Sequence, residues 1–507
     1  MPYLYGASIQ GIQSFIFETS MLREIAGASE LVEKLCSKES ILEAVENDSN
    51  GIEWLLTAAG NIRICTDKAD VVSEIVLKWP RIVSVKAPGI TVSQAVVLYE
   101  GPLTGKHIDE LERKLRSQRN FAISTEFPGL MATERSRRTG RPAVSKDTSG
   151  GGDLDEGTIA KHEANRHASS SLMSKIIPED FPQHARNSCK FPFDLSDISG
   201  SSESSWIAVI HADGNDLGRV IRQISTDVSN NGKCSAVAAI KGFSAAVDRA
   251  TKTAARSAFR YVLGEDCFQH YDKYPIRPVV LGGDDITVIC RADLALEFSK
   301  AFLSEFRQES TSALEEVGAS HGISSLKTGL SACAGIAFIK DHYPFHYGVK
   351  LANELCEQAK RKSKSYGMIT TPSSLMFHKV HSSFVEDYAS ISERELRVED
   401  VSFDIGPLFL EKETPEGAQG LTDFLSTVER LSTPKAPSSG LRRWLTELYR
   451  GRDYADSLMI RLKEIASEEC GEYMDILNST IFTRDGSDYS PVYHWLAALS
   501  VARAKGR

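Results

Sequence analysis

Two adjacent carboxylates stand in the middle of an apolar stretch, VVLGGDDITVIC, at residues 279–290. The glycines and the apolar arms predict a β-hairpin whose turn carries Asp284 and Asp285. Adjacent like charges repel unless a cation stabilises both, and Mg²⁺ prefers hard oxygen ligands of this kind. The pair therefore predicts metal-dependent chemistry, although Gly-Asp is also ordinary turn sequence.

A third carboxylate ends a second apolar strand, in WIAVIHADGNDLGRVI at residues 206–221. If that strand lies beside the hairpin, Asp213 joins Asp284 and Asp285 at one end of a sheet as catalytic, metal-binding residues. We expect Gly282 and Gly283 to shape the turn between the hairpin strands.

Residues suited to binding phosphate lie on either side of the predicted carboxylate site. Gly214, Asn215, Asp216 and Gly218 lead into a helix, where backbone amides can cradle phosphate oxygens. Lys360 and Lys364 lie four residues apart on a later predicted helix, so both can contact the same phosphates. Together these residues suit in-line attack of a 3′-hydroxyl on an α-phosphate, with Mg²⁺ or Mn²⁺ as the cofactor.

The elements that must position these residues repeat along the chain. Residues 205–378 predict the order β–α–ββ–α–β–α, and residues 1–103 begin in the same way. We therefore expect an α+β fold with two ferredoxin-like, palm-type domains. Residues 104–204 are rich in Gly, Ser and charge and predict a linker-like helical subdomain with mobile loops. Residues 405–507 predict a C-terminal helical domain.

The composition is that of a globular protein without a global basic field. The 507 residues carry a net charge of −9, so any polyanion must meet local clusters such as RSRRTGR (135–141) and KRKSK (360–364). The nine cysteines form no CxxC pair, which predicts reduced thiols and no structural zinc. We find no secretion signal and no apolar run of about 20 residues, and we expect a cytoplasmic protein without a membrane partner.

The motifs together resemble a known family. IQGIQSFIFETSMLREIAGASELV (9–32) is similar to the opening of the first palm domain of the large polymerase-cyclase subunit of type III CRISPR effector complexes. IAVIHADGNDLGRVI and VVLGGDDITVIC resemble the first strand and the GGDD hairpin of that family's second palm. GIAFIKDHYPFHYGVKLANELCEQAKRKSK resembles the strand and helix that follow. The resemblance spans most of residues 1–375 and, more weakly, the helical C-terminus.

The resemblance implies an enzyme that joins ATP into cyclic oligoadenylates as antiviral second messengers. By position, Asp213, Asp284 and Asp285 hold the metals and Lys360 contacts the triphosphate. In the first module Gly60 and Asn61 stand where carboxylates would be, so we expect a degenerate site that binds nucleotide or only packs. The chain lacks the family's histidine-aspartate nuclease start and its cysteine zinc site, so we expect no DNA cleavage and consider a shortened stand-alone relative.

Two other functions remain open on the residues alone. The palms could serve as a nucleotide- or RNA-binding scaffold in a CRISPR effector complex with little turnover, or they could form a GGDEF-like cyclase that uses GTP. Three carboxylates kept together favour an enzyme, because a scaffold has no use for them. The sequence does not specify the base of the nucleotide substrate, the ring size of the product or the activating signal. It also leaves open the RNA or protein partners and whether chains form a homo-oligomer.

Overall fold

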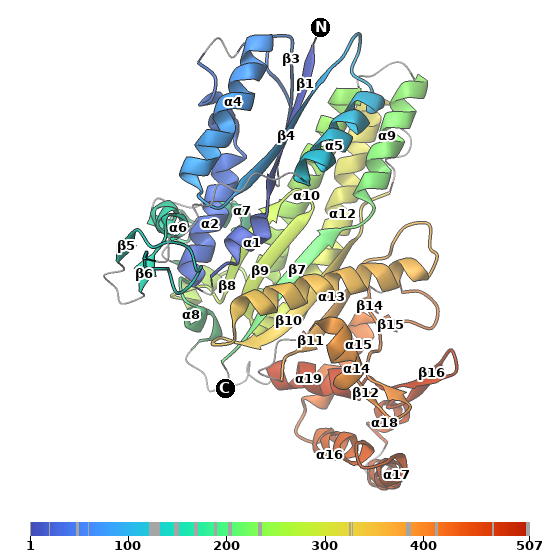
Figure 1. The fold of residues 1–507 in the computed structure, drawn as a ribbon. Coiled ribbons are helices and arrows are strands. Elements are labelled where there is room, and N and C mark those ends of the chain that lie inside the picture. The colour runs from blue at the N-terminus through green and yellow to red at the C-terminus, as the bar shows by residue number, and fades with distance from the viewer. Residues whose placement is uncertain are drawn as a thin grey trace.

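The structure is a computed structural model. It describes residues 2–502 apart from 20, 47–49, 59, 121–131, 147–151, 167–170, 187–189, 201–204, 232–235, 324–325, 327, 382–386, 411–413 and 469–470. Figure 1 shows the chain running from the first sheet (blue) through the second sheet (green to orange) to the C-terminal elements (orange to red). Among the described helices, none combines the length and the apolar character that crossing a bilayer requires.

The first sheet has four antiparallel strands in the order β2-β3-β1-β4. The strands are β1 (Tyr3–Gln10), β2 (Glu53–Ala58), β3 (Asn61–Thr66) and β4 (Thr91–Leu98). The helices of this part are α1 (Ile12–Ile16), α2 (Leu22–Leu35), α3 (Lys38–Leu42), α4 (Ala69–Lys86) and α5 (Gly105–Arg119). Strand alternation turns Tyr5 to the main core, whereas Leu4 packs with Leu111 and Leu115 of α5. Both faces of the sheet are therefore covered.

The second sheet repeats this topology and extends it. Its order is β15-β14-β11-β10-β7-β9-β8, so that β10-β7-β9-β8 matches β4-β1-β3-β2 of the first sheet. The strands are β7 (Trp206–Gly214), β8 (Ile276–Gly282), β9 (Asp285–Arg291), β10 (Ala332–Lys340), β11 (Ser374–Lys379), β14 (Leu408–Phe409) and β15 (Gln419–Gly420). The predicted α+β class with two ferredoxin-like sheets is confirmed.

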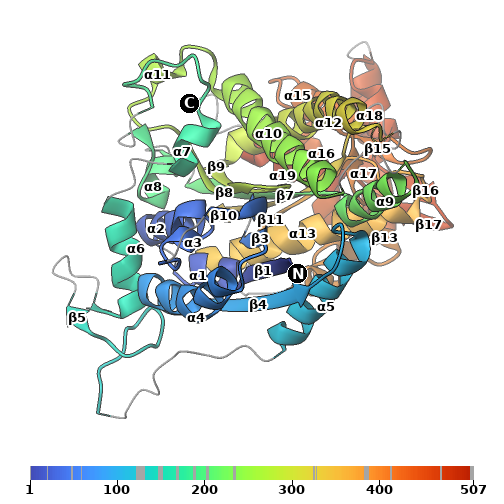
Figure 2. The ribbon, with the colours of Figure 1, turned by 90° about the horizontal axis from the view of Figure 1, so that it is seen from above.

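Helices cover both faces of the second sheet. They are α9 (Leu217–Asn231), α10 (Ala236–Leu263), α11 (Cys267–His270), the 3₁₀ turn η2 (Ala292–Leu294), α12 (Ala295–His321) and α13 (Phe345–Ser365). Figure 2 shows α10 and α12 on one side of the strands and α13 on the other. Gly335 of β10 lets α13 approach closely, since a Cβ there would lie 2.0 Å from the carbonyl oxygen of Ala352. This contact fixes α13 over the strand that pairs with β7.

The segment between the two sheets contains short elements. These are β5 (Ser145–Lys146), β6 (Asp153–Leu154), α6 (Glu156–Arg166), α7 (Ser171–Ile176) and α8 (Leu195–Ser199). Helix α6 packs on α2 of the first sheet. Mobile loops were predicted here, and the stretches 121–131, 147–151, 167–170, 187–189 and 201–204 lie outside the described residues.

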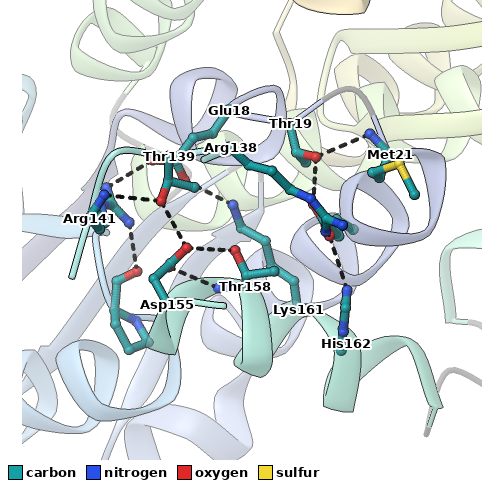
Figure 3. Close-up of polar contacts among 12 residues, drawn as sticks. Glu18, Thr19, Met21, Arg138, Thr139, Arg141, Asp155, Thr158, Lys161 and His162 are labelled. Carbon is teal, nitrogen blue, oxygen red and sulfur yellow. Dashed lines mark hydrogen bonds and ion pairs between the residues drawn. The ribbon is translucent and has the colours of Figure 1, made fainter. Parts of the chain in front are cut away.

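A polar network joins this segment to the turn between α1 and α2 (Figure 3). The buried Lys161 of α6 donates to Glu18 Oε2 at 3.1 Å. The buried Glu24 of α2 pairs with Arg138 and, at 3.1 Å, with Nε2 of His162. Asp155 accepts hydrogen bonds from Thr139 and Thr158, each at 2.8 Å. Buried charges need such partners, so these contacts tie the described part of the segment to the first sheet's helices.

The C-terminal region is mainly helical, as predicted. Its helices are α14 (Tyr388–Arg394), α15 (Leu421–Leu431), α16 (Ser438–Leu448), α17 (Arg452–Glu468), α18 (Met474–Asn478) and α19 (Val492–Ala502). It also holds a small sheet that the sequence did not predict, made of β12 (Arg397–Val398), β13 (Val401–Ser402), β16 (Phe482–Arg484) and β17 (Ser487–Tyr489). Strands this short leave too few residues for an alternating pattern.

Candidate active site

Asp213 and Asp285 face each other across neighbouring strands. They are direct partners in the antiparallel pairing of β7 with β9, near the end of both strands. Asp284 lies in the two-residue turn between β8 and β9, because Gly282 pairs with Asp285. Each of the three carboxylates offers an oxygen within 4.8 Å of the others. Residues about seventy positions apart in the sequence thus form one acidic cluster.

Two glycines permit this geometry. Gly283 has φ 65°, the left-handed conformation that a tight hairpin turn requires and that side chains disfavour. At Gly214, a Cβ would lie 2.9 Å from the Cβ of Asp284. The end of β7 can therefore approach the turn closely only because residue 214 lacks a side chain.

The three carboxyl groups have different pKa values. Burial and the charge of Asp213 raise the pKa of Asp284 to about 7. Burial and the charges of Asp213 and Asp284 raise the pKa of Asp285 well above its ordinary value. Burial acts in the same direction on Asp213, but the ammonium of Lys360 and hydrogen bonds from the two partner carboxyls outweigh it and lower the pKa. Without a bound metal ion, Asp284 and Asp285 therefore keep their protons to a higher pH than ordinary carboxyl groups do.

Lys360 of α13 contacts the acidic cluster. Its Nζ donates to Asp213 Oδ2 and, at 3.0 Å, to the carbonyl oxygen of Gly214. Lys364, one turn further along α13, is 3.7 Å from Asp216 Oδ1 and is more exposed. The structure thus brings Lys360 to the acidic cluster and places Lys364 at its edge.

The residues after Asp213 make mostly internal contacts. Asn215 is buried, and its amide donates to Ser331 Oγ at 3.0 Å and to the Cys333 sulfur at 3.4 Å. Asp216, at φ 60°, accepts hydrogen bonds from the backbone amide and, at 2.8 Å, the hydroxyl of Thr371. The side chains of both residues therefore hold the loop. A Cβ built on Gly218 would meet no other atom within 4 Å, so the start of α9 is open at this residue.

Two residues of α10 support the turn, and no sequence pattern pointed to them. Thr251 is fully buried and donates to the carbonyl oxygen of Gly283 at 2.6 Å. Asp248 accepts from the amide of Gly283 at 3.4 Å. Beneath the cluster, Nδ1 of His211 is 3.1 Å from Thr287 Oγ1, and burial lowers the pKa of His211 to about 4. His211 is thus a neutral buried residue next to the carboxylates.

The first sheet contains a neutral counterpart of this cluster. Ser8 and Asn61 are direct partners of β1 and β3, at the places that Asp213 and Asp285 occupy in β7 and β9. Ser8 Oγ donates to Asn61 Oδ1 at 3.0 Å, and Gly60 occupies the turn position of Asp284. Arg119, near the end of α5, lies 3.5 Å from Ser8 as Lys360 of α13 lies beside Asp213. The first sheet thus has a basic side chain at this site, Arg119, but no carboxylates.

A family model matches the part of the chain that holds the acidic cluster: Cas10/Cmr2, second palm domain, over residues 206–367. Residues 206–367 thus resemble a Cas10/Cmr2 second palm. This domain includes Asp213, Asp284, Asp285 and Lys360. The predicted resemblance to the polymerase-cyclase subunit is confirmed. No curated protein matches the sequence.

Solved structures share the fold of the whole chain. A chain of the Csm1-Csm4 cassette in complex with cA4 has a TM-score of 0.52 at 14% identity, covering 100% of this chain and 70% of that chain. The cassette in complex with cA3 gives 0.52 at 13% identity with the same coverage. The cassette in complex with one ATP gives 0.51 at 14% identity, covering 99% and 70%. At this identity the likeness establishes a common fold around the Cas10/Cmr2 palm.

The acidic cluster suits a divalent cation. Its donors are carboxylate oxygens, which Mg²⁺ and Mn²⁺ prefer, and they lie close enough to share one or two ions. The raised pKa values of Asp284 and Asp285 reflect burial and, after it, repulsion between the carboxylates, which a cation would relieve. The residues present therefore fit the cofactor expected from the sequence.

Proposed function

We propose that this chain is a metal-dependent nucleotidyltransferase that joins ATP into cyclic oligonucleotides. The observation that carries the proposal is the convergence of Asp213, Asp284 and Asp285 within 4.8 Å at the end of a Cas10/Cmr2 second palm. The solved relatives were captured with cA4, cA3 and ATP, which supports a nucleotide ligand of this class. The domain division 1–103, 104–204, 205–378 and 405–507 is part of the same proposal.

Each residue of the palm site has a role in this proposal. Asp213, Asp284 and Asp285 hold Mg²⁺ or Mn²⁺. The bound metal would lower the pKa of the attacking 3′-hydroxyl and neutralise charge on the pyrophosphate leaving group. Lys360 turns from Asp213 to the triphosphate once the carboxylates are neutralised. The backbone amides of residues 216–218 face phosphate oxygens. The amides of Gly214 and Asn215 are not available, because they donate to backbone carbonyl oxygens of the protein. Thr251 and Asp248 keep the turn rigid, so that the two turn acids stay in place.

The first sheet would hold the second nucleotide without a metal. Its site offers the hydroxyl of Ser8, the amide of Asn61 and the guanidinium of Arg119, and it lacks carboxylates at the matching positions. Such a site can bind phosphate but cannot hold a catalytic cation. We therefore assign catalysis to the second palm alone, with RNA or CRISPR effector subunits as its partners.

The experiment is an assay of turnover. The purified protein is incubated with α-labelled ATP or GTP and Mg²⁺ or Mn²⁺, with and without RNA, and the products are separated by chromatography. Cyclic or linear oligonucleotides formed from ATP support the proposal. Product from GTP alone would instead support the GGDEF-like alternative. Absence of product with every substrate and metal, in protein that still binds ATP, would support the scaffold.

A further inference from the structure

A group of cationic side chains lies at the other end of the palm sheet. Trp206 begins β7 and pairs with Lys340 at the end of β10, and Lys379 ends β11. Direct strand partners point to the same face of a sheet, so these three side chains share one face. Asp213 lies seven residues along β7 and on the opposite face, about 23 Å away at the rise of an extended strand. The group is therefore separate from the acidic cluster.

The positive charges gather around one aromatic ring. Lys340 Nζ lies 4.4 Å and Lys379 Nζ 4.3 Å from the centroid of the Trp206 ring. Arg442 of α16 adds a third cation. Burial, Lys340 and Arg442 together lower the pKa of Lys379 to about 8. Three like charges thus repel one another at a site where one of them is buried.

No carboxylate balances these charges among the described residues. Lys340, Lys379 and Arg442 form no ion pair within that part of the chain, and Lys379 donates only to Ser500 Oγ of α19, at 2.5 Å. The nearby Glu395 pairs instead with His378, at 3.5 Å. Elsewhere in the same region the fold does pair a half-buried lysine, since Lys362 contacts both oxygens of Asp404 at 2.7 Å.

The cations remain open to solvent on one side. Lys379 is 7% exposed, Lys340 is half-buried and Arg442 is exposed, so an anion entering past Arg442 would reach the two lysines. Contact with the Trp206 ring restricts the rotamers of the two lysines. A preformed set of three donors that has no counter-charge among the described residues suits a compact, multiply charged anion.

We propose that Trp206, Lys340, Lys379 and Arg442 form an anion site that binds a phosphate group at the junction of the palm sheet with α16 and α19. The phosphate is either that of a free anion such as pyrophosphate or that of an RNA backbone, and both present the same oxygens. Because α16 supplies Arg442 and α19 supplies Ser500, an occupied site holds the C-terminal helices against the sheet. This site does not depend on the proposed nucleotidyltransferase activity.

Binding in the absence of divalent metal tests the proposal. Pyrophosphate and a 12-residue oligouridylate are titrated into the full chain in EDTA at low salt by calorimetry. The Lys340→Ala, Arg442→Ala double variant removes the two accessible cations, and Lys379→Met removes the buried one. Lys241→Met, an exposed lysine of α10, is the control. We expect the cluster variants to weaken binding at least about tenfold, as for the loss of a charge-assisted hydrogen bond, and the control to bind as the wild type does.

The two ligands distinguish the sources. Pyrophosphate binding that is lost in the cluster variants indicates a free anion, and oligouridylate binding lost in the same way without pyrophosphate binding indicates an RNA strand. Equal affinities in all four proteins, or no binding of either ligand to the wild type, would overturn the proposal. Thermal melts check that each variant folds. If Lys379→Met does not fold, the Lys340→Ala, Arg442→Ala double variant still tests the proposal.

Discussion

Lys360 of α13 donates to Asp213 of β7, and this contact joins the acidic cluster to the helix that covers its face. Gly335 makes the contact possible, because α13 passes directly over the backbone of β10 at this residue. The lysine thus occupies the cluster in the structure and is within reach of any phosphate that comes to it. This relationship leads to predictions for both partners.

Replacing the turn acids should abolish catalysis and leave the fold intact. We expect the Asp284→Asn, Asp285→Asn double variant to lose nucleotide joining by at least about a thousandfold, because a metal site supplies several kcal/mol to the transition state. In EDTA at pH 8 the variant should melt at a higher temperature than the wild type, since it removes two buried carboxyls that are costly to ionise. A lower melting temperature would point to a structural role for the acids.

The stability of the metal-free protein should fall as the pH rises. The pKa of Asp284 is raised from its ordinary value of 3.8 to about 7 in the folded chain, so the folded state binds this proton more tightly than the unfolded state does. The stabilisation is complete below about pH 4 and is lost between about pH 4 and 7. Thermal melts in EDTA should show a decline over this window that is smaller in Asp284→Asn. An identical pH profile in the two proteins would contradict the raised pKa.

Lys360→Met should separate substrate binding from metal binding. Without the ammonium, Asp213 loses its partner and should bind Mn²⁺ at least as tightly as before, whereas the triphosphate loses a charge-assisted contact. We expect the KM for ATP to rise about tenfold or more, with the Mn²⁺ affinity retained. Lys350→Met on the same helix, an exposed lysine near Glu354, is the matched control. Loss of Mn²⁺ binding in Lys360→Met would contradict this role.

Thr251→Val should loosen the turn without touching substrate. The hydroxyl that donates to Gly283 is lost, and a buried carbonyl oxygen is left without this partner. We expect kcat to fall about tenfold while the KM for ATP stays within about twofold, because only the alignment of the turn acids changes. Thr253→Val makes the same substitution two residues further along α10 and should leave both constants unchanged. A fall in the binding of ATP equal to the fall in kcat would contradict a positioning role.

The strand order and the carboxylate positions could be predicted because they follow from local patterns. Alternating apolar residues, Gly-Asp turns and their spacing along the chain specify a ferredoxin-like sheet, and that sheet brings Asp213 to Asp285. The support from Thr251 could not be predicted, because a threonine in a helix carries no mark of a partner 32 residues away. Asn215 shows the opposite case, since its sequence position suggests phosphate but its side chain turns into the core.

The central claim is that three carboxylates of the palm share a divalent cation, and Mn²⁺ binding followed by electron paramagnetic resonance tests it most directly. The free Mn²⁺ signal should decrease when the wild-type protein and a non-hydrolysable ATP analogue are added, and it should persist with the Asp284→Asn, Asp285→Asn double variant. Equal loss of the signal with the two proteins would show that the ion binds elsewhere and would contradict the account.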